Sequence, residues 1–197
     1  MNKFIRLALF AAVIGNMSYL RAEEFHEHGA HEHGSAKLNI ALEGGALYLE
    51  MDSPAVNFFG FEHPPINEED EHLLAKVKAQ LQQPQNLFTL PAAAACTVKE
   101  TEVTSELFGD VATHNGEHDD HEGMEDHDAD HDEHHPEHAD VRMSYRFDCQ
   151  SPAHLNFLEL GLFAQFPLTR DVDVQIITDR GQTQLELHPE NIRIDLQ

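Results

Sequence analysis

Apolar and polar residues alternate almost without interruption between residues 36 and 52, and the pattern breaks only at Gly44-Gly45. Alternate side chains of a β-strand point to opposite faces, and a Gly-Gly pair suits a tight hairpin turn. The segment therefore predicts an antiparallel hairpin with one buried face, formed by Leu38, Ile40, Leu42, Leu47, Leu49 and Met51.

A helix is predicted over residues 68–82 because its start, its periodicity and its end are all marked. Asn67 is a suitable N-cap, acidic residues fill the first turn, and Pro84 follows the last turn. An apolar run at 155–166 fits either a helix or a strand. Further strands are expected at 96–104, 141–149, 172–178, 183–187 and 191–196.

A short internal repeat suggests two related halves. Ser53-Pro54-Ala55 recurs as Ser151-Pro152-Ala153, and Asn57-Phe58 recurs as Asn156-Phe157 with a slip of one residue. The predicted fold class is therefore α+β and β-rich: two pseudo-symmetric halves of antiparallel strands with one or two helices. The predicted organisation is a signal peptide, an N-terminal half, a histidine-rich insert and a C-terminal half, over residues 1–22, 23–110, 111–138 and 139–197.

The insert carries the strongest chemical signal of the chain. Residues 114–138 hold eight histidines and eleven Asp or Glu residues, with no Lys or Arg. The stretch has too few apolar residues for their burial to offset the loss of chain entropy on folding. It is therefore expected to be disordered when no metal is bound. An acidic linker would explain the carboxylates but not the histidines, and neutral imidazole binds zinc, copper and nickel. The expected metal ligands are His114, His118, His121, His127, His131, His134, His135 and His138.

Further histidines precede the first predicted strand and follow the hairpin. His26, His28, His31 and His33 stand in the sequence EFHEHGAHEHG, where the two-residue spacing puts side chains on one face of an extended chain. His63, in the rigid Phe61-Glu62-His63-Pro64-Pro65 segment, is another candidate ligand. From its spacing alone, an ordinary loop residue is the favoured interpretation of His63.

The first residues resemble an export signal. Lys3 and Arg6 precede an apolar run at 7–15, and cleavage after Ala22 is expected. This run is too short to span a bilayer, and no later segment is long enough, so no stable membrane insertion is expected. The formal net charge of −24 disfavours nucleic acid as a partner and attracts cations.

An exported protein can keep its two cysteines as a disulfide. If the segments 96–104 and 141–149 pair in antiparallel fashion, Cys96 faces Cys149. One detail opposes this register, because it places Lys99 opposite Arg146 and like charges there repel. Metal-binding thiolates are the alternative, although the chain has no CxxC spacing.

Several segments together resemble the ZrgA family of zinc-regulated periplasmic proteins implicated in zinc uptake. They are HEHGSAKLNIALEGGALYLEMDSPAVNFFGFEHPP, PAAAACTV, MSYRFDCQSPAHL, FAQFP and ITDRGQT, and the resemblance covers nearly all of residues 26–197. It implies a periplasmic location, a variable histidine-rich insert and two pseudo-symmetric halves. It also implies that His31, His33 and His63 are ordered metal ligands.

Two functions remain, and neither is enzymatic. The sequence has no HExxH motif, nucleophile elbow or phosphate-binding loop, so catalysis is not expected. The first hypothesis is a periplasmic protein that collects zinc and passes it to the substrate-binding protein of an ABC importer. The alternative is a buffer that sequesters excess zinc, copper or nickel. Induction by zinc starvation would favour the first, and induction by metal excess the second.

Overall fold

Two β-sheets of unequal size face each other in the computed structural model, which describes residues 32–109 and 138–196. The expected signal peptide, His26, His28, His31 and the insert histidines from His114 to His135 lie outside these residues. The elements are β1 (Ser35–Glu43), β2 (Ala46–Pro54), α1 (Val56–Phe59), α2 (Glu68–Leu81), α3 (Pro84–Leu87), β3 (Phe88–Thr89), η1 (Ala92–Ala94), β4 (Cys96–Ser105), η2 (Glu106–Phe108), β5 (Asp140–Cys149), η3 (Pro152–His154), β6 (Phe157–Leu160), α4 (Leu162–Gln165), β7 (Asp171–Thr178), β8 (Gly181–Leu187) and β9 (Arg193–Asp195).

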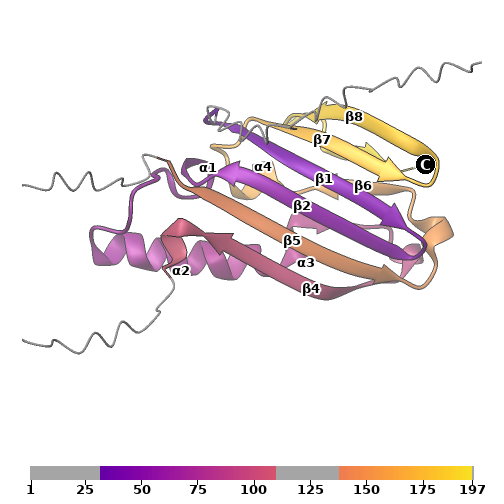
Figure 1. Cartoon of the computed structure of the whole chain (residues 1–197), viewed down its shortest axis with the longest axis horizontal. Helices are drawn as coiled ribbons and strands as arrows, with labels where there is room; N and C mark the ends of the chain where they lie inside the picture. Colours follow the sequence, from indigo (N-terminus) through magenta and orange to yellow (C-terminus); the bar gives the residue numbers. More distant parts are fainter. Residues whose placement is uncertain (1–31, 110–137, 197) are drawn as a thin grey trace, which may run out of the picture.

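The large sheet contains six strands in the order β4-β5-β2-β1-β7-β8 (Figure 1). β1 and β2 form the predicted hairpin, with Leu38 opposite Met51 and Ile40 opposite Leu49. Their alternating apolar side chains are buried on one face, and the polar side chains on the other face are exposed. The predicted hairpin is therefore confirmed, including its turn at Gly44-Gly45.

β4 and β5 pair as the sequence predicts, and Cys96 and Cys149 form a disulfide. The register shifts between Val98 and Glu100, so a bulge at Lys99 places Glu100, rather than Lys99, opposite Arg146. Nη1 of Arg146 lies 2.8 Å from Oε1 of Glu100. The extra residue thus replaces the like-charge contact expected from an uninterrupted register with an ion pair.

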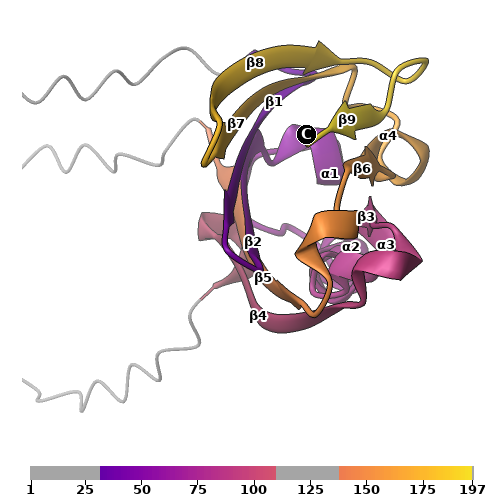
Figure 2. The same ribbon diagram turned by 90° about the vertical axis from the view of Figure 1, so that its right-hand side faces the viewer.

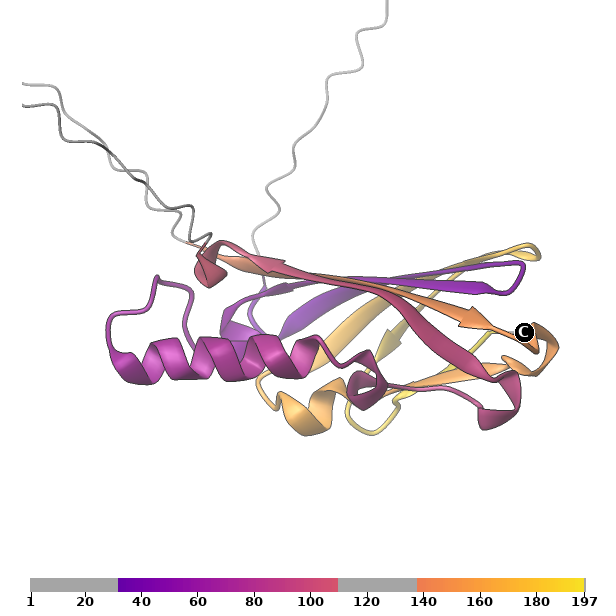
Figure 3. The same ribbon diagram turned by 90° about the horizontal axis from the view of Figure 1, so that it is seen from below.

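Helix α2 covers part of the buried face of the large sheet, as seen from below in Figure 3. Its N-cap is the predicted Asn67, whose side chain accepts a hydrogen bond from the backbone N–H of Asp70. At the other end, the Tyr145 hydroxyl of β5 donates to the carbonyl of Leu81 at 2.7 Å. Burial raises the pKa of the Tyr145 phenol, which keeps this donor protonated. No helix in the described ranges is long and apolar enough to cross a bilayer.

The second sheet, in the order β3-β6-β9, lies with α3 and α4 on the concave side of the large sheet (Figure 2). The ambiguous run at 155–166 contains both structures, because strand β6 ends at Leu160 and helix α4 begins at Leu162. One continuous hydrophobic core fills the space between the two sheets. The strand-rich α+β class is thus confirmed, with one long α-helix, three single-turn α-helices and three short 3-10 helices among the described residues.

One strand pairing departs from the expected antiparallel arrangement. β7 pairs with β1 in parallel, with Leu38 opposite Val174. A parallel neighbour requires a crossover connection, and here the chain crosses through β6 and α4 of the second layer before it reaches β7. Sequence periodicity carries no information about such a long-range direction.

The first six strands are arranged as two equivalent units. β1-β2 and β4-β5 are antiparallel pairs that meet at β2 and β5, and β3 pairs with β6 in the small sheet. The insert joins β4 to β5, the two strands of the second unit. β7, β8 and β9 follow these two units.

We call the end of the large sheet that lies beside the candidate ligands His33 and His138 the metal end, and the opposite end the disulfide end. At the metal end β1 begins, β2 ends at Pro54, β4 ends at Ser105 and β5 begins at Asp140. At the disulfide end lie the turn at Gly44-Gly45 and the Cys96–Cys149 bond. Because the insert and the N-terminal histidine stretch join the fold next to Gly109, His138 and Glu32, both are attached at the metal end.

Candidate metal centre

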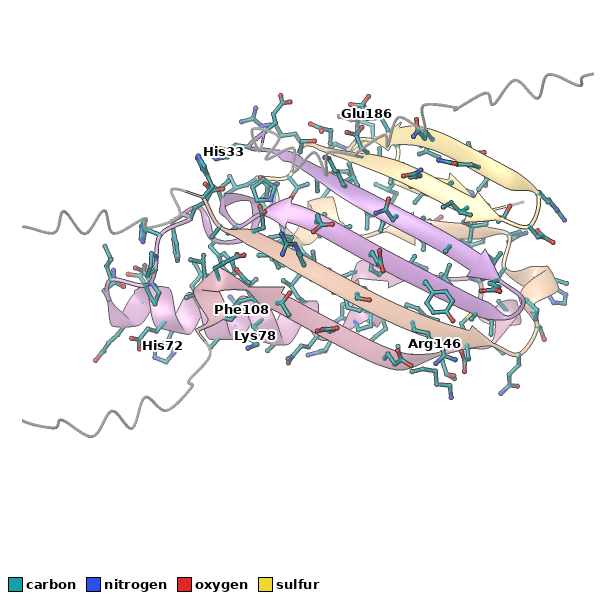
Figure 4. All side chains as sticks on the ribbon, viewed as in Figure 1. His33, His72, Lys78, Phe108, Arg146 and Glu186 are labelled. Atoms are coloured by element: carbon teal, nitrogen blue, oxygen red, sulfur yellow. A yellow bond between two sulfur atoms is a disulfide. The ribbon has the colours of Figure 1, made fainter. Side chains whose placement is uncertain are left out.

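Three side chains meet at the metal end: His33, Glu62 and His138. Among the described residues they form a group of His and carboxylate side chains whose ligand atoms all lie within 4.8 Å of one another. Oε2 of Glu62 lies 3.4 Å from Nε2 of His33 and 2.9 Å from Nδ1 of His138. The two imidazole rings stand edge to face, with centroids 6.4 Å apart. Figure 4 shows His33 at this end of the sheet.

His33 is held by a turn immediately before β1. The N–H of Ser35 donates to the carbonyl of Glu32, and Gly34 adopts a φ of +98° that other residues rarely accept. The carbonyl of Gly34 then accepts hydrogen bonds from the N–H groups of Arg170 and Asp171. A Cβ atom at Gly34 would lie 3.2 Å from the Arg170 side chain, so this close approach also favours glycine.

Glu62 is placed by the end of α1. The helix ends at Gly60, whose φ of +81° turns the chain in the left-handed conformation, and Glu62 follows two residues later. The Glu62 side chain is only 9% exposed, whereas the side chains of His33 and His138 are 56% and 57% exposed. The carboxylate therefore forms the floor of the group and the imidazoles form its rim.

The second carboxylate oxygen of Glu62 is the clearest sign that the group is incomplete. Oε1 is buried and has no hydrogen-bond partner within the described part of the chain. An unpaired buried polar atom costs roughly 1–3 kcal/mol, and a charged one costs more. A cation beside this carboxylate would offset that cost, whereas a neutral ligand without a donor would not.

His138 is fixed by its neighbours at the start of β5. The carbonyl of Ala139 accepts a hydrogen bond of 2.8 Å from the N–H of Ala55, which follows the end of β2. The N–H of Asp140 donates to Oε2 of Glu106 at 3.1 Å. His138 therefore belongs to the ordered fold, although the sequence groups it with the histidines of the insert.

The donor set suits a divalent zinc ion. Zinc binds imidazole nitrogen and carboxylate oxygen at about 2.0–2.2 Å, so two ligand atoms of a tetrahedral site lie roughly 3.3 Å apart. The distance of 3.4 Å between His33 and Glu62 already matches this spacing. The 2.9 Å contact between Nδ1 of His138 and Oε2 of Glu62 is a hydrogen bond. The proton shared between these two atoms must leave when both bind a metal ion. Three protein ligands leave a fourth position open.

His63, the third ordered ligand that the resemblance implies, does not join this group. Its ring stacks on Phe61 with centroids 4.7 Å apart, and its Nδ1 donates to the carbonyl of Pro64 at 2.8 Å. The stacked ring of His63 thus lies outside the group formed by His33, Glu62 and His138. Glu62 was not among the predicted ligands, and its burial depends on contacts that no local pattern reveals.

The fold and this donor set define a strand-rich, disulfide-bonded protein with a two-histidine, one-carboxylate group suited to a divalent metal ion. The sequence matches the model of a family described as "ZrgA family zinc uptake protein" over residues 30–196. The match covers most of the chain, which therefore belongs to the ZrgA family of zinc uptake proteins. The resemblance found in the sequence is thereby confirmed. No curated protein matches the chain.

Proposed function

We propose that this protein binds zinc in the periplasm with His33, Glu62 and His138, and supports zinc uptake by passing the ion to a transport protein. The Glu62 carboxylate carries the proposal: its Oε2 contacts two imidazoles, and its Oε1 is buried without a partner among the described residues. Membership of a zinc uptake family and a disulfide typical of proteins outside the cytosol support it.

The position of the group favours collection followed by transfer. The N-terminal histidine stretch ends at His33, and the insert ends at His138. Many exchangeable sites are therefore tethered to one preorganised site, and tethering raises the local concentration of zinc around it. A preorganised site needs less ordering on binding, so it should hold zinc more tightly than the insert does.

The exposure of the group favours transfer over catalysis. A hydrolytic zinc site also uses three protein ligands and an open position, but it lies in a shaped cavity that shields the substrate and the zinc-bound water from bulk solvent. Here both imidazole side chains are more than half exposed. An ion bound there is accessible to an incoming ligand from another protein, such as the substrate-binding protein of an ABC importer.

Uptake by cells in zinc-depleted medium tests the proposed function. The host lacking its own copy of the gene would carry either the natural chain or a chain with His33→Ala and Glu62→Gln, and cellular zinc would be measured by mass spectrometry. We expect the double variant to restore zinc no better than an empty vector. His72→Ala, on the exposed side of α2, is the matched control and should restore it fully.

Regulation separates uptake from the alternative of a sequestering buffer. We expect the transcript to rise during zinc starvation. A rise only in excess zinc, copper or nickel, together with normal uptake in the double variant, would support the buffer and reject the proposed function.

A further inference from the structure

Asn57 is a polar residue buried in the core near the metal end, with 1% of its surface exposed. Its side chain uses all its main hydrogen-bonding groups. Oδ1 accepts from the N–H of Gly34 at 2.8 Å, and Nδ2 donates to the carbonyl of Ser35 and to Oγ of Ser53, each at 2.9 Å. A buried amide costs free energy unless it is paired in this way, so its position is strongly determined.

The hydrogen bonds of Asn57 connect the segments that carry the three proposed metal ligands. Gly34 directly follows His33, so the Oδ1 contact fixes the turn that presents this imidazole. Asn57 itself lies in α1, whose end at Gly60 places Glu62. Ser53 belongs to the last residues of β2, and the next segment reaches the chain beside His138 through the N–H of Ala55 and the carbonyl of Ala139.

The internal repeat provides a comparison within the same molecule. The counterpart of Asn57 in the second unit is Asn156, which is exposed. Its backbone carbonyl accepts a hydrogen bond from the N–H of Leu196. The buried amide network is thus found in the unit that carries His33 and Glu62, and the repeated motif does not require it.

We propose that Asn57 is a positioning residue for zinc binding, which acts by holding the His33 turn at the correct distance from Glu62. This inference rests on the proposed function. Zinc ligands must be placed within a few tenths of an ångström, and partners that orient them typically contribute about 10- to 100-fold to metal affinity. Without Asn57 the N–H of Gly34 loses its acceptor and the turn gains freedom, which must be lost again when zinc binds.

The test uses the full chain with the other histidine-rich sites removed. We call silenced chain the full-length protein in which Gln replaces His26, His28, His31, His114, His118, His121, His127, His131, His134 and His135. Zinc affinity is measured by competition with a chelator, well below the melting temperature of each variant. Cobalt(II), whose visible spectrum reports the ligands around the ion, serves as the second probe.

In the silenced chain, Asn57→Ala should weaken zinc binding about 10-fold or more and change the cobalt spectrum toward that of His33→Ala. Asn156→Ala, the same substitution in the repeat, should stay within about 2-fold of the parent. Leu158→Ala removes a fully buried side chain from β6 and lowers stability without touching this network, and it should also bind zinc normally.

Several results would overturn the inference. One is that Asn57→Ala binds zinc as the parent does. Another is that Leu158→Ala weakens zinc binding equally, which would make the effect one of stability. If Asn57→Ala does not fold, Ser53→Ala decides: it removes one acceptor of Nδ2 and should weaken binding about 2- to 5-fold, and unchanged binding rejects the inference. If the silenced chain holds no ion that depends on His33, the proposed function itself fails, and the role of Asn57 with it.

Discussion

The disulfide end and the metal end of the large sheet differ in how their charged side chains are paired. At the disulfide end, Cys96 and Cys149 join β4 to β5, and Arg146 lies between Glu100 at 2.8 Å and Asp148 at 3.1 Å. The hydrogen bond that Arg146 donates to Glu100 and the negative charge of Asp148 raise the pKa of Arg146. At this end, therefore, the cysteines and the Arg146 guanidinium are all paired with other residues of the same chain.

At the metal end, the backbone is equally well fixed but the charge is not neutralised. Glu62 meets two imidazoles rather than an arginine, and one of its oxygens is buried without a partner among the described residues. The comparison shows that a fixed backbone and an incomplete charge balance can coexist. Such a combination favours binding of a cation from outside the chain.

The largest effect is expected from breaking the disulfide. Cys96→Ser with Cys149→Ser should lower the free energy of unfolding by about 4 kcal/mol, because the bond closes a loop with a sequence separation of 53. The two ends lie roughly 30 Å apart along β5, so zinc affinity of the folded variant should not change. Urea denaturation and chelator competition measure the two quantities. Loss of zinc affinity in the folded variant would show that the ends are not independent.

Acidification should act only on the metal end. Imidazole binds a metal only in its neutral form, so protons compete with zinc at both histidines of the group and throughout the insert. Between about pH 7.5 and 5 we expect zinc affinity to fall roughly a thousand-fold, with the fold intact. Equilibrium dialysis and circular dichroism at each pH provide the measurement. Full zinc occupancy at pH 5 would exclude imidazole as the main ligand.

Glu62→Gln tests the carboxylate directly. The amide has nearly the same shape but no charge, so zinc affinity of the silenced chain should fall on the order of 100-fold, or about 2.7 kcal/mol. A matched change at the disulfide end, Glu100→Gln, removes one charge from an exposed pair and should leave zinc binding unchanged. Calorimetry on both variants makes the comparison. Equal effects would mean that only the overall negative charge attracts zinc.

The smallest effect is expected at His63. Its ring stacks on Phe61 outside the ligand group, so His63→Ala should change zinc affinity of the silenced chain by less than about 2-fold. His33→Ala in the same titration provides the positive control. A loss as large as that of His33→Ala would restore His63 to the ligand set and require the loop at 61–65 to rearrange on binding.

Local signals in the sequence predict the β1-β2 hairpin and helix α2, because alternation, turn residues and an N-cap act over a few positions. The pairing of Cys96 with Cys149 also follows from the two strands. The bulge that removes the unfavourable contact of Lys99 was not predicted from the sequence. The parallel pairing of β7 with β1 has no local signal, because it depends on how the chain crosses the second layer.

The candidate site could be predicted only in part for a related reason. Histidines were the visible signal, and two of them, His33 and His138, lie in the group. Choosing Glu62 over His63 required knowing which side of the loop faces the core. That choice is made by tertiary packing, since both residues are plausible ligands in the sequence.

The central claim is that the described fold holds one zinc ion by itself, independently of the histidine-rich stretches. The direct test is the number of zinc ions bound per silenced chain, measured by dialysis and atomic absorption, with and without Glu62→Gln. Deleting the whole insert would be a poorer test, because a deletion through residue 138 also removes a ligand of the group. With free zinc held at about ten times the Kd of the silenced chain, we predict close to one bound ion per silenced chain and roughly a tenth of that after Glu62→Gln. A silenced chain that binds no zinc, or one whose ion persists after Glu62→Gln, would contradict the claim.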